Sequence, residues 1–122
     1  MPSRNVLSHE QRMASLARAN EVRILKANDK REIRYGRLDP RSILRDPPPH
    51  WQNAPIGELL LSVPRVGRAR MDNWLKIRRI AATRPLSGLT AHERASLAGT
   101  LEMVLGWRQT QRMAAQMDSA RA

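Results

Sequence analysis

Apolar residues recur at helical spacing along much of the chain. The clearest case lies before Pro64, where Ile56, Leu59, Leu60 and Val63 fall on one face of a helix that the proline ends. The alternation of β-branched and aromatic residues that is typical of strands is missing almost everywhere. The pattern therefore predicts an all-α protein, and it places the start of this helix at residues 53–55.

The first predicted element is a long helix that ends at about Tyr35. Ser8 and Gln11 have the spacing of a capping box at its start, and Gly36 suits the left-handed residue that ends a helix. Its apolar residues form a thin stripe that drifts around the helix. We therefore expect this helix to pack only partly on a core, with its N-terminal half projecting into solvent.

A short helix and a proline-rich linker are predicted next. Asp39 can cap a helix in which Pro40 takes the first position, and this helix is expected to run through Leu44. The three prolines Pro47–Pro49 forbid a helix and favour an extended segment. We interpret this segment as a linker within the domain.

Two more helices are predicted after Pro64. One runs over about 68–79 and turns Met71, Trp74 and Leu75 toward the core. The other opens with a second capping box, Thr90 to Glu93. Its inner face carries four apolar residues, which are Leu97, Leu101, Val104 and Leu105. Residues 106–122, with Trp107, Met113 and Met117, are expected to be a loosely helical or frayed extension.

Composition restricts the kind of chemistry that the chain can perform. The 122 residues fit a single domain, and cysteine is absent, which excludes disulfides, thiolate zinc sites and a cysteine nucleophile. The histidines His9, His50 and His92 are scattered, and no paired carboxylates or glycine-rich phosphate loop with lysine is present. We therefore expect no enzyme activity, no cofactor and no bound metal. The tryptophans are widely spaced, so we interpret them as packing residues.

The charge points to a polyanionic partner. Lysine and arginine total 22 against 11 acidic residues, which gives a net charge of +11, and 19 of the basic residues are arginine. Arginine grips phosphate with two hydrogen bonds and stays charged. Residues 64–94 alone carry eight basic and two acidic residues, a net charge of +6. Such a field attracts nucleic acid or an anionic surface.

The turn between the third and fourth predicted helices is the strongest candidate site. A glycine at Gly67 permits a tight turn, and the helix that starts there presents unpaired N–H groups and the positive end of its dipole. Arg65 and Arg68 flank these groups, so the geometry suits a phosphate. The alternative is that this is only a helix–helix turn with solvated arginines. For Asp72 and Lys76 we favour ion pairing along the helix as the interpretation.

These residues belong to a longer pattern, which is Leu-Leu-x-Ser-Val-Pro-Arg-Val-Gly-Arg-Ala-Arg from Leu59, then Ile80-Ala81, then Thr83-Arg84-x-Leu86-x-Gly88-Leu89 and Arg94-x-x-Leu97. Over about residues 7–102 the chain resembles the actinobacterial integration host factor family. The resemblance implies a monomeric, cytoplasmic, nucleoid-associated protein with a helix-two-turns-helix module. Such a protein binds double-stranded DNA with little sequence preference, bends or compacts it, and assists a phage integrase in recombination.

The resemblance also implies where DNA is bound. The phosphate-binding turn falls on Arg65 to Arg68 and a basic loop on 83–89, where Pro85 and Ser87 stand at positions that are usually arginine in the family. Two arginines near the end of the long helix are added to this set. The predicted DNA-binding residues are Arg34, Arg37, Arg65, Val66, Gly67, Arg68, Arg70, Arg84, Ser87 and Gly88.

On this interpretation the chain has four parts: a long basic helix over 1–36, a short helix and proline-rich linker over 37–54, the helix-two-turns-helix module over 55–105, and a C-terminal extension over 106–122. No apolar run approaches the ~20 residues that span a bilayer, and no secretory signal is evident, so we expect a soluble protein with no membrane partner. Two other functions stay open, namely binding of RNA or the ribosome, and docking on a recombinase through the extension.

Overall fold

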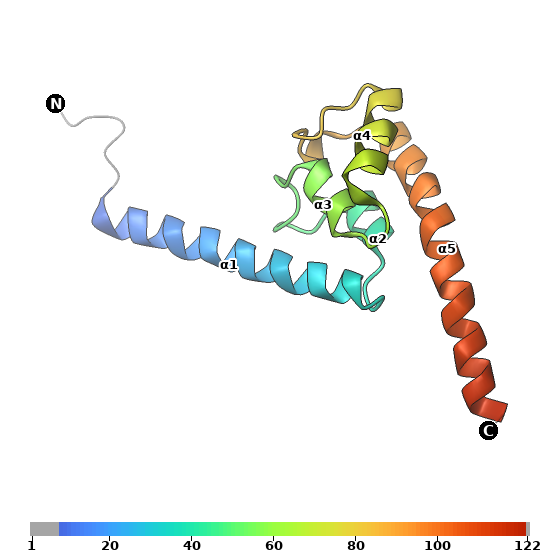
Figure 1. The fold of residues 1–122 in the computed structure, drawn as a ribbon. Coiled ribbons are helices and arrows are strands. Elements are labelled where there is room, and N and C mark those ends of the chain that lie inside the picture. The colour runs from blue at the N-terminus through green and yellow to red at the C-terminus, as the bar shows by residue number, and fades with distance from the viewer. Residues whose placement is uncertain (1–7, 122) are drawn as a thin grey trace.

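The computed structural model is all-helical, as predicted (Figure 1). It describes the backbone of residues 8–121 and the side chains of residues 8–106. The helices are α1 (His9–Arg34), α2 (Pro40–Arg45), α3 (Ile56–Ser62), α4 (Gly67–Arg78) and α5 (Ala91–Arg121), with the short 3-10 helix η1 (Leu86–Gly88) before α5. Within the described backbone no strand forms, and an isolated β-bridge joins Pro55 and Pro85.

The helix boundaries follow the signals in the sequence. The Ser8 hydroxyl accepts from the Gln11 amide at 3.1 Å and the Gln11 side chain accepts from the Ser8 amide at 2.9 Å, so the capping box of α1 forms. Thr90 and Glu93 form the second box in front of α5, with distances of 2.8 and 3.1 Å. Gly36 is left-handed, with φ of 72°. Only α3 starts later than predicted, at Ile56, because Pro55 is extended and acts as its N-cap.

One hydrophobic core lies between the short helices and the first part of α5. It is built almost entirely from aliphatic side chains contributed by every helix. Its members are Ile33, Ile43, Leu44, Trp51, Ala54, Ile56, Leu59, Leu60, Val63, Val66, Met71, Leu75, Ile80, Leu86, Leu89, Leu97, Ala98 and Leu101. Trp51 is fully buried and Trp74 half-buried, which confirms that these two tryptophans are packing residues.

The proline-rich segment after α2 is more than a spacer. Beyond the extended Pro47 and Pro48 the chain turns, and the Trp51 amide donates to the Pro48 carbonyl at 2.8 Å. This turn places the Trp51 ring in the core. The segment therefore anchors the fold at its centre.

Both long helices extend past this core in different directions (Figure 1). Residues 9–21 of α1 are all exposed, which confirms that its N-terminal half projects into solvent. The backbone of α5 is helical through Arg121, with Leu97 and Leu101 buried and Val104 and Leu105 half-buried. The predicted roles of Trp107, Met113 and Met117 fall on side chains outside the described residues. None of the described helices is long and apolar enough to cross a membrane.

Candidate nucleic-acid interface

The turn between α3 and α4 is fixed by two buried valines. Val63 and Val66 both lie in the core, and the Val66 amide donates to the Val63 carbonyl at 3.3 Å. Between and beside them the backbone is left-handed twice, with φ of 73° at Arg65 and 66° at Gly67. Glycine adopts this conformation freely, whereas arginine does so at a cost of roughly 1 kcal/mol. The sequence indicated the glycine but carried no signal for the strained arginine.

The first turn of α4 is open to solvent. Gly67, Arg68 and Ala69 are exposed, and a Cβ atom built on Gly67 would meet nothing within 4 Å. In the part of the chain that the structure describes, the amides of these three residues donate to no acceptor outside α4. Helix geometry leaves such amides without a partner inside the helix. They therefore present hydrogen-bond donors and the positive end of the helix dipole to any anion that approaches.

Among the described residues, no carboxylate pairs with Arg68 beside these amides. Among residues 8–106, Asp72 makes no ion pair with either Arg68 or Lys76, so the ion pairing predicted along this helix does not form. Both basic side chains are exposed. The surface of α4 is thus cationic at its first turn and farther along the helix.

Arg65, which precedes the first turn of α4, also borders a second surface together with Arg70. Arg70 donates to the Arg65 carbonyl at 3.2 Å, and both line a hollow of about 420 Å³ between α4 and α5. Its other lining residues are Trp74, Thr100, Met103 and Val104. Arg70 therefore lies on the side of α4 that faces α5, whereas Arg68 lies in the first turn of α4.

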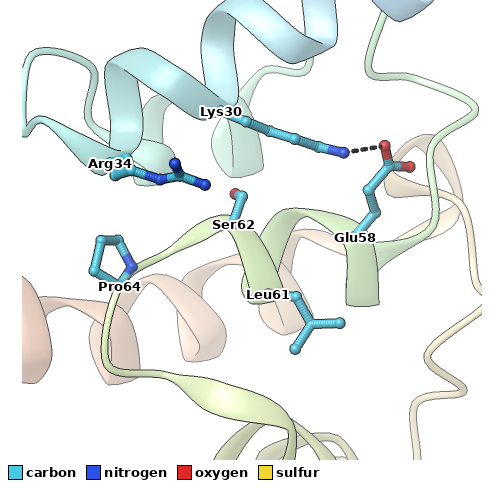
Figure 2. A pocket seen from close by; sticks show the side chains of 6 residues that line it. All are labelled: Lys30, Arg34, Glu58, Leu61, Ser62 and Pro64. Atoms are coloured by element: carbon cyan, nitrogen blue, oxygen red, sulfur yellow. Dashed lines mark ion pairs between the residues drawn. The ribbon is translucent and has the colours of Figure 1, made fainter.

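A second hollow, of about 450 Å³, lies between α1 and α3 (Figure 2). Arg34, Lys30 and Ser62 line it, and Pro64 brings it next to the turn between α3 and α4. Lys30 and Lys26 contact Glu58 at 2.8 and 3.1 Å. Partial burial acts to raise the pKa of Glu58, but the hydrogen bonds from Lys30 and Lys26 outweigh it and hold that pKa below its usual value. Glu58 is therefore ionised at neutral pH, and Lys30 and Arg34 together still give the lining a net charge of +1.

Arg37 and Arg34 have different surroundings in the structure. Arg37 is bound to Glu32 at 2.7 and 3.0 Å and stacks over the Tyr35 ring at 5.0 Å. The hydrogen bond from Arg37 is the main cause that lowers the pKa of Glu32, so this pair stays charged. Arg37 has thus satisfied its charge within its own turn of chain, whereas Arg34 lies beside the candidate site.

The predicted basic loop at 83–89 lies at the opposite end of α3 from the turn. Arg84 binds Glu93 at 2.7 and 2.9 Å and the Gly88 carbonyl at 3.0 Å. The amides of Leu86 and Ser87 donate to Ala54 and Gln52, each at 3.0 Å, and the Gly88 amide donates to Pro85 at 2.9 Å. These contacts hold the loop at the start of α3, whereas the turn follows its end. The structure does not bring Arg84, Ser87 and Gly88 together with Arg65 to Arg68.

Basic residues form a row along one side of α1, and this row was not predicted from the sequence. At 100° per residue, five of them fall within about 80° of arc on one side of the helix, and these are Arg12, Arg23, Lys26, Lys30 and Arg34. The acidic residues of the helix lie on the other side: Glu10, Glu21, Asp29 and Glu32. The row spans roughly 33 Å and ends in the hollow beside the turn. Plotting charge against helical angle would have revealed it.

Comparisons with protein families, with curated proteins and with solved structures find no match to this chain. No group of acidic or histidine side chains in the described residues could hold a metal ion. The function therefore has to be argued from the surfaces described above.

Proposed function

We propose that this protein is an architectural DNA-binding protein that holds the phosphate backbone of duplex DNA at the first turn of α4. The observation that carries the proposal is that this turn is uncovered, with free amides beside Arg68 and with Arg65 preceding them. Amides and guanidinium groups recognise phosphate and carry no base information. Binding should therefore depend little on sequence.

The basic row on α1 supports a second contact with the same duplex, because its five residues keep a net charge of +4 even with Glu58 paired to Lys26 and Lys30. It leads away from the hollow next to the turn, and its length of roughly 33 Å is close to one turn of B-DNA. A duplex that touches both the α4 turn and this row must follow the angle between the two surfaces. This favours bending or compaction of DNA, and in this proposal α1 makes the second contact in place of the loop at 83–89. The resemblance extends the proposal to a cytoplasmic, nucleoid-associated protein that assists an integrase.

The proposal is tested by binding unrelated duplexes over a range of salt concentrations. Counterion release predicts that log K falls linearly with log salt. Arg65→Gln combined with Arg68→Gln should weaken binding to all duplexes alike and reduce the slope by about one per lost phosphate contact. Lys76→Gln combined with Arg79→Gln is the matched control, because it removes the same charge about 15 Å farther along α4.

The outcomes separate DNA binding at the turn from a site elsewhere, from RNA binding and from docking on a protein partner. A flat salt response, or an equal effect of the two double variants, would place the binding site elsewhere. Competition by duplex RNA at the same concentration as duplex DNA would favour the RNA-binding alternative, since phosphate contacts alone serve both. Truncation after Gly106 that leaves DNA affinity unchanged but abolishes integrase-dependent recombination would assign the extension to a protein partner.

A further inference from the structure

The N-terminal half of α1 extends beyond the hydrophobic core. Every residue from His9 to Glu21 is exposed, whereas Lys26 and Asp29 farther along the helix contact Glu58 and Trp51. A helix of this length is marginal in water when nothing packs against it. The segment therefore has the properties of a helix that is stabilised by binding another surface.

One face of this segment carries four apolar residues, with His9 and Asn20 between them, and has an acidic edge. Met13 and Ile24 are 54% and 53% exposed, and together with Leu16 and Ala17 they fall within about 100° of arc. Glu10 and Glu21 border this face on one edge, while Arg12 and Arg23 border it on the other. A surface that receives this face should be apolar at its centre and basic along one rim.

The hollow between α4 and α5 has these properties. Its apolar lining is Trp74, Val104 and Met103, and Met103 is 81% exposed. Arg65 and Arg70 line the side formed by the turn and α4, and no carboxylate lines the hollow. Large exposed apolar side chains grouped beside arginines are typical of protein-binding sites.

The two surfaces cannot meet within one molecule. Lys26 and Lys30 fix the C-terminal half of α1 to Glu58 on α3, and α1 is one unbroken helix. Its N-terminal half therefore points away from the body (Figure 1), whereas the hollow is lined by residues of α4, α5 and the turn before α4. Contact between them requires two copies.

We infer that the N-terminal half of α1 docks in the α4–α5 hollow of a second copy of this chain, with Glu10 and Glu21 toward Arg70. The contact is heterologous, because each copy contributes the N-terminal half of α1 to one contact and its α4–α5 hollow to another. Such contacts continue into open chains unless the geometry closes a ring. The monomer that the resemblance implies then holds at low protein concentration, and association grows as the concentration rises. On a duplex, if the proposed function holds, copies would bind as linked neighbours.

The test is sedimentation velocity of the full chain without DNA, so that it is independent of the proposed function. The sedimentation coefficient of the natural protein should rise with concentration. Met13→Asp combined with Ile24→Asp disrupts the α1 face, and Met103→Asp disrupts the α4–α5 hollow. Each variant alone should stay at the monomer value, whereas their equimolar mixture should form dimers and nothing larger, since one intact surface of each kind remains.

Controls separate this contact from other kinds of association. Ile77→Asp changes another exposed apolar residue, on α4 outside the hollow, and should associate like the natural protein. If circular dichroism shows that the α1 double variant loses helix, Glu21→Lys and Arg70→Glu replace it, and each should reduce association. A natural protein that stays monomeric up to millimolar concentration overturns the inference. So does association of Met103→Asp alone, which would indicate a symmetric α1–α1 contact.

Discussion

The indole Nε1 of Trp51 donates a 2.8 Å hydrogen bond to Oδ2 of Asp29. Trp51 follows the proline-rich segment and is fully buried, whereas Asp29 lies on α1. The same carboxylate oxygen lies 2.6 Å from Nε2 of His50. This contact joins the long helix to the centre of the core, and together with the ion pairs of Glu58 it determines where α1 leaves the body.

Loss of the Asp29 carboxylate should destabilise the fold. Asp29→Ala leaves the buried indole N–H of Trp51 without an acceptor, which costs about 1–3 kcal/mol in the free energy of unfolding. Asp29→Asn keeps an acceptor oxygen and should cost less. Urea unfolding followed by tryptophan fluorescence measures both. Asp72→Ala is the control and should change stability by less than about 0.5 kcal/mol, because Asp72 is exposed and forms no ion pair with Arg68 or Lys76.

The ion pairs of Glu58 should make stability depend on pH. The pKa of Glu58 is lowered from 4.5 in the folded protein. Between this lowered pKa and the ordinary value the unfolded chain binds more protons than the folded chain, so the free energy of unfolding rises with pH. Glu58→Gln should cost about 1 kcal/mol at pH 7, and this difference should disappear as the pH falls through the folded pKa. Chemical unfolding of both proteins at pH 7 and near pH 3 measures it. A difference that persists unchanged in acid would contradict the ion-pair explanation.

Two glycines should respond oppositely to alanine. Gly67 has a φ of 66°, so Gly67→Ala places a Cβ atom in the left-handed region and should cost about 1 kcal/mol, although the space is empty. Gly99 lies within α5 and also has empty space around it. Gly99→Ala should therefore stabilise the protein by about 0.5–1 kcal/mol. Thermal unfolding distinguishes them, and equal shifts of Tm in one direction would disprove the conformational argument.

Arg94 should matter for folding rather than for binding. Its guanidinium donates to the carbonyls of Leu44, Leu86 and Leu89 at 2.8, 2.6 and 3.2 Å, which joins α2, η1 and α5. Lysine has no planar fork, so Arg94→Lys should lower the free energy of unfolding by about 2 kcal/mol. Arg68→Lys at the exposed turn should change it by less than about 0.5 kcal/mol. Urea unfolding compares the two variants, and equal stability of both would contradict a structural role for Arg94.

Local signals in the sequence predicted the elements well. Capping boxes at Ser8 and Thr90, the Asp39–Pro40 start of α2 and the face of Ile56, Leu59, Leu60 and Val63 all depend on neighbours within one or two helical turns. Such interactions form wherever the residues occur at the right spacing. The sequence was also sufficient to place a solvent-exposed glycine turn before α4.

The use of each basic side chain was decided by the tertiary structure alone. Arg68 and Arg84 look alike in the sequence, yet Arg84 meets Glu93 and the Gly88 carbonyl, while Arg68 meets no carboxylate among the described residues. Arg78 likewise binds Ser96 and Thr100 on α5. Whether a guanidinium is consumed by the fold depends on acceptors far along the chain, which only packing brings within reach. The sequence by itself therefore determined the helices, the turn and the total charge. The fold decided which arginines remain available to a partner, because hydrogen-bond partners across elements are a property of three-dimensional distance.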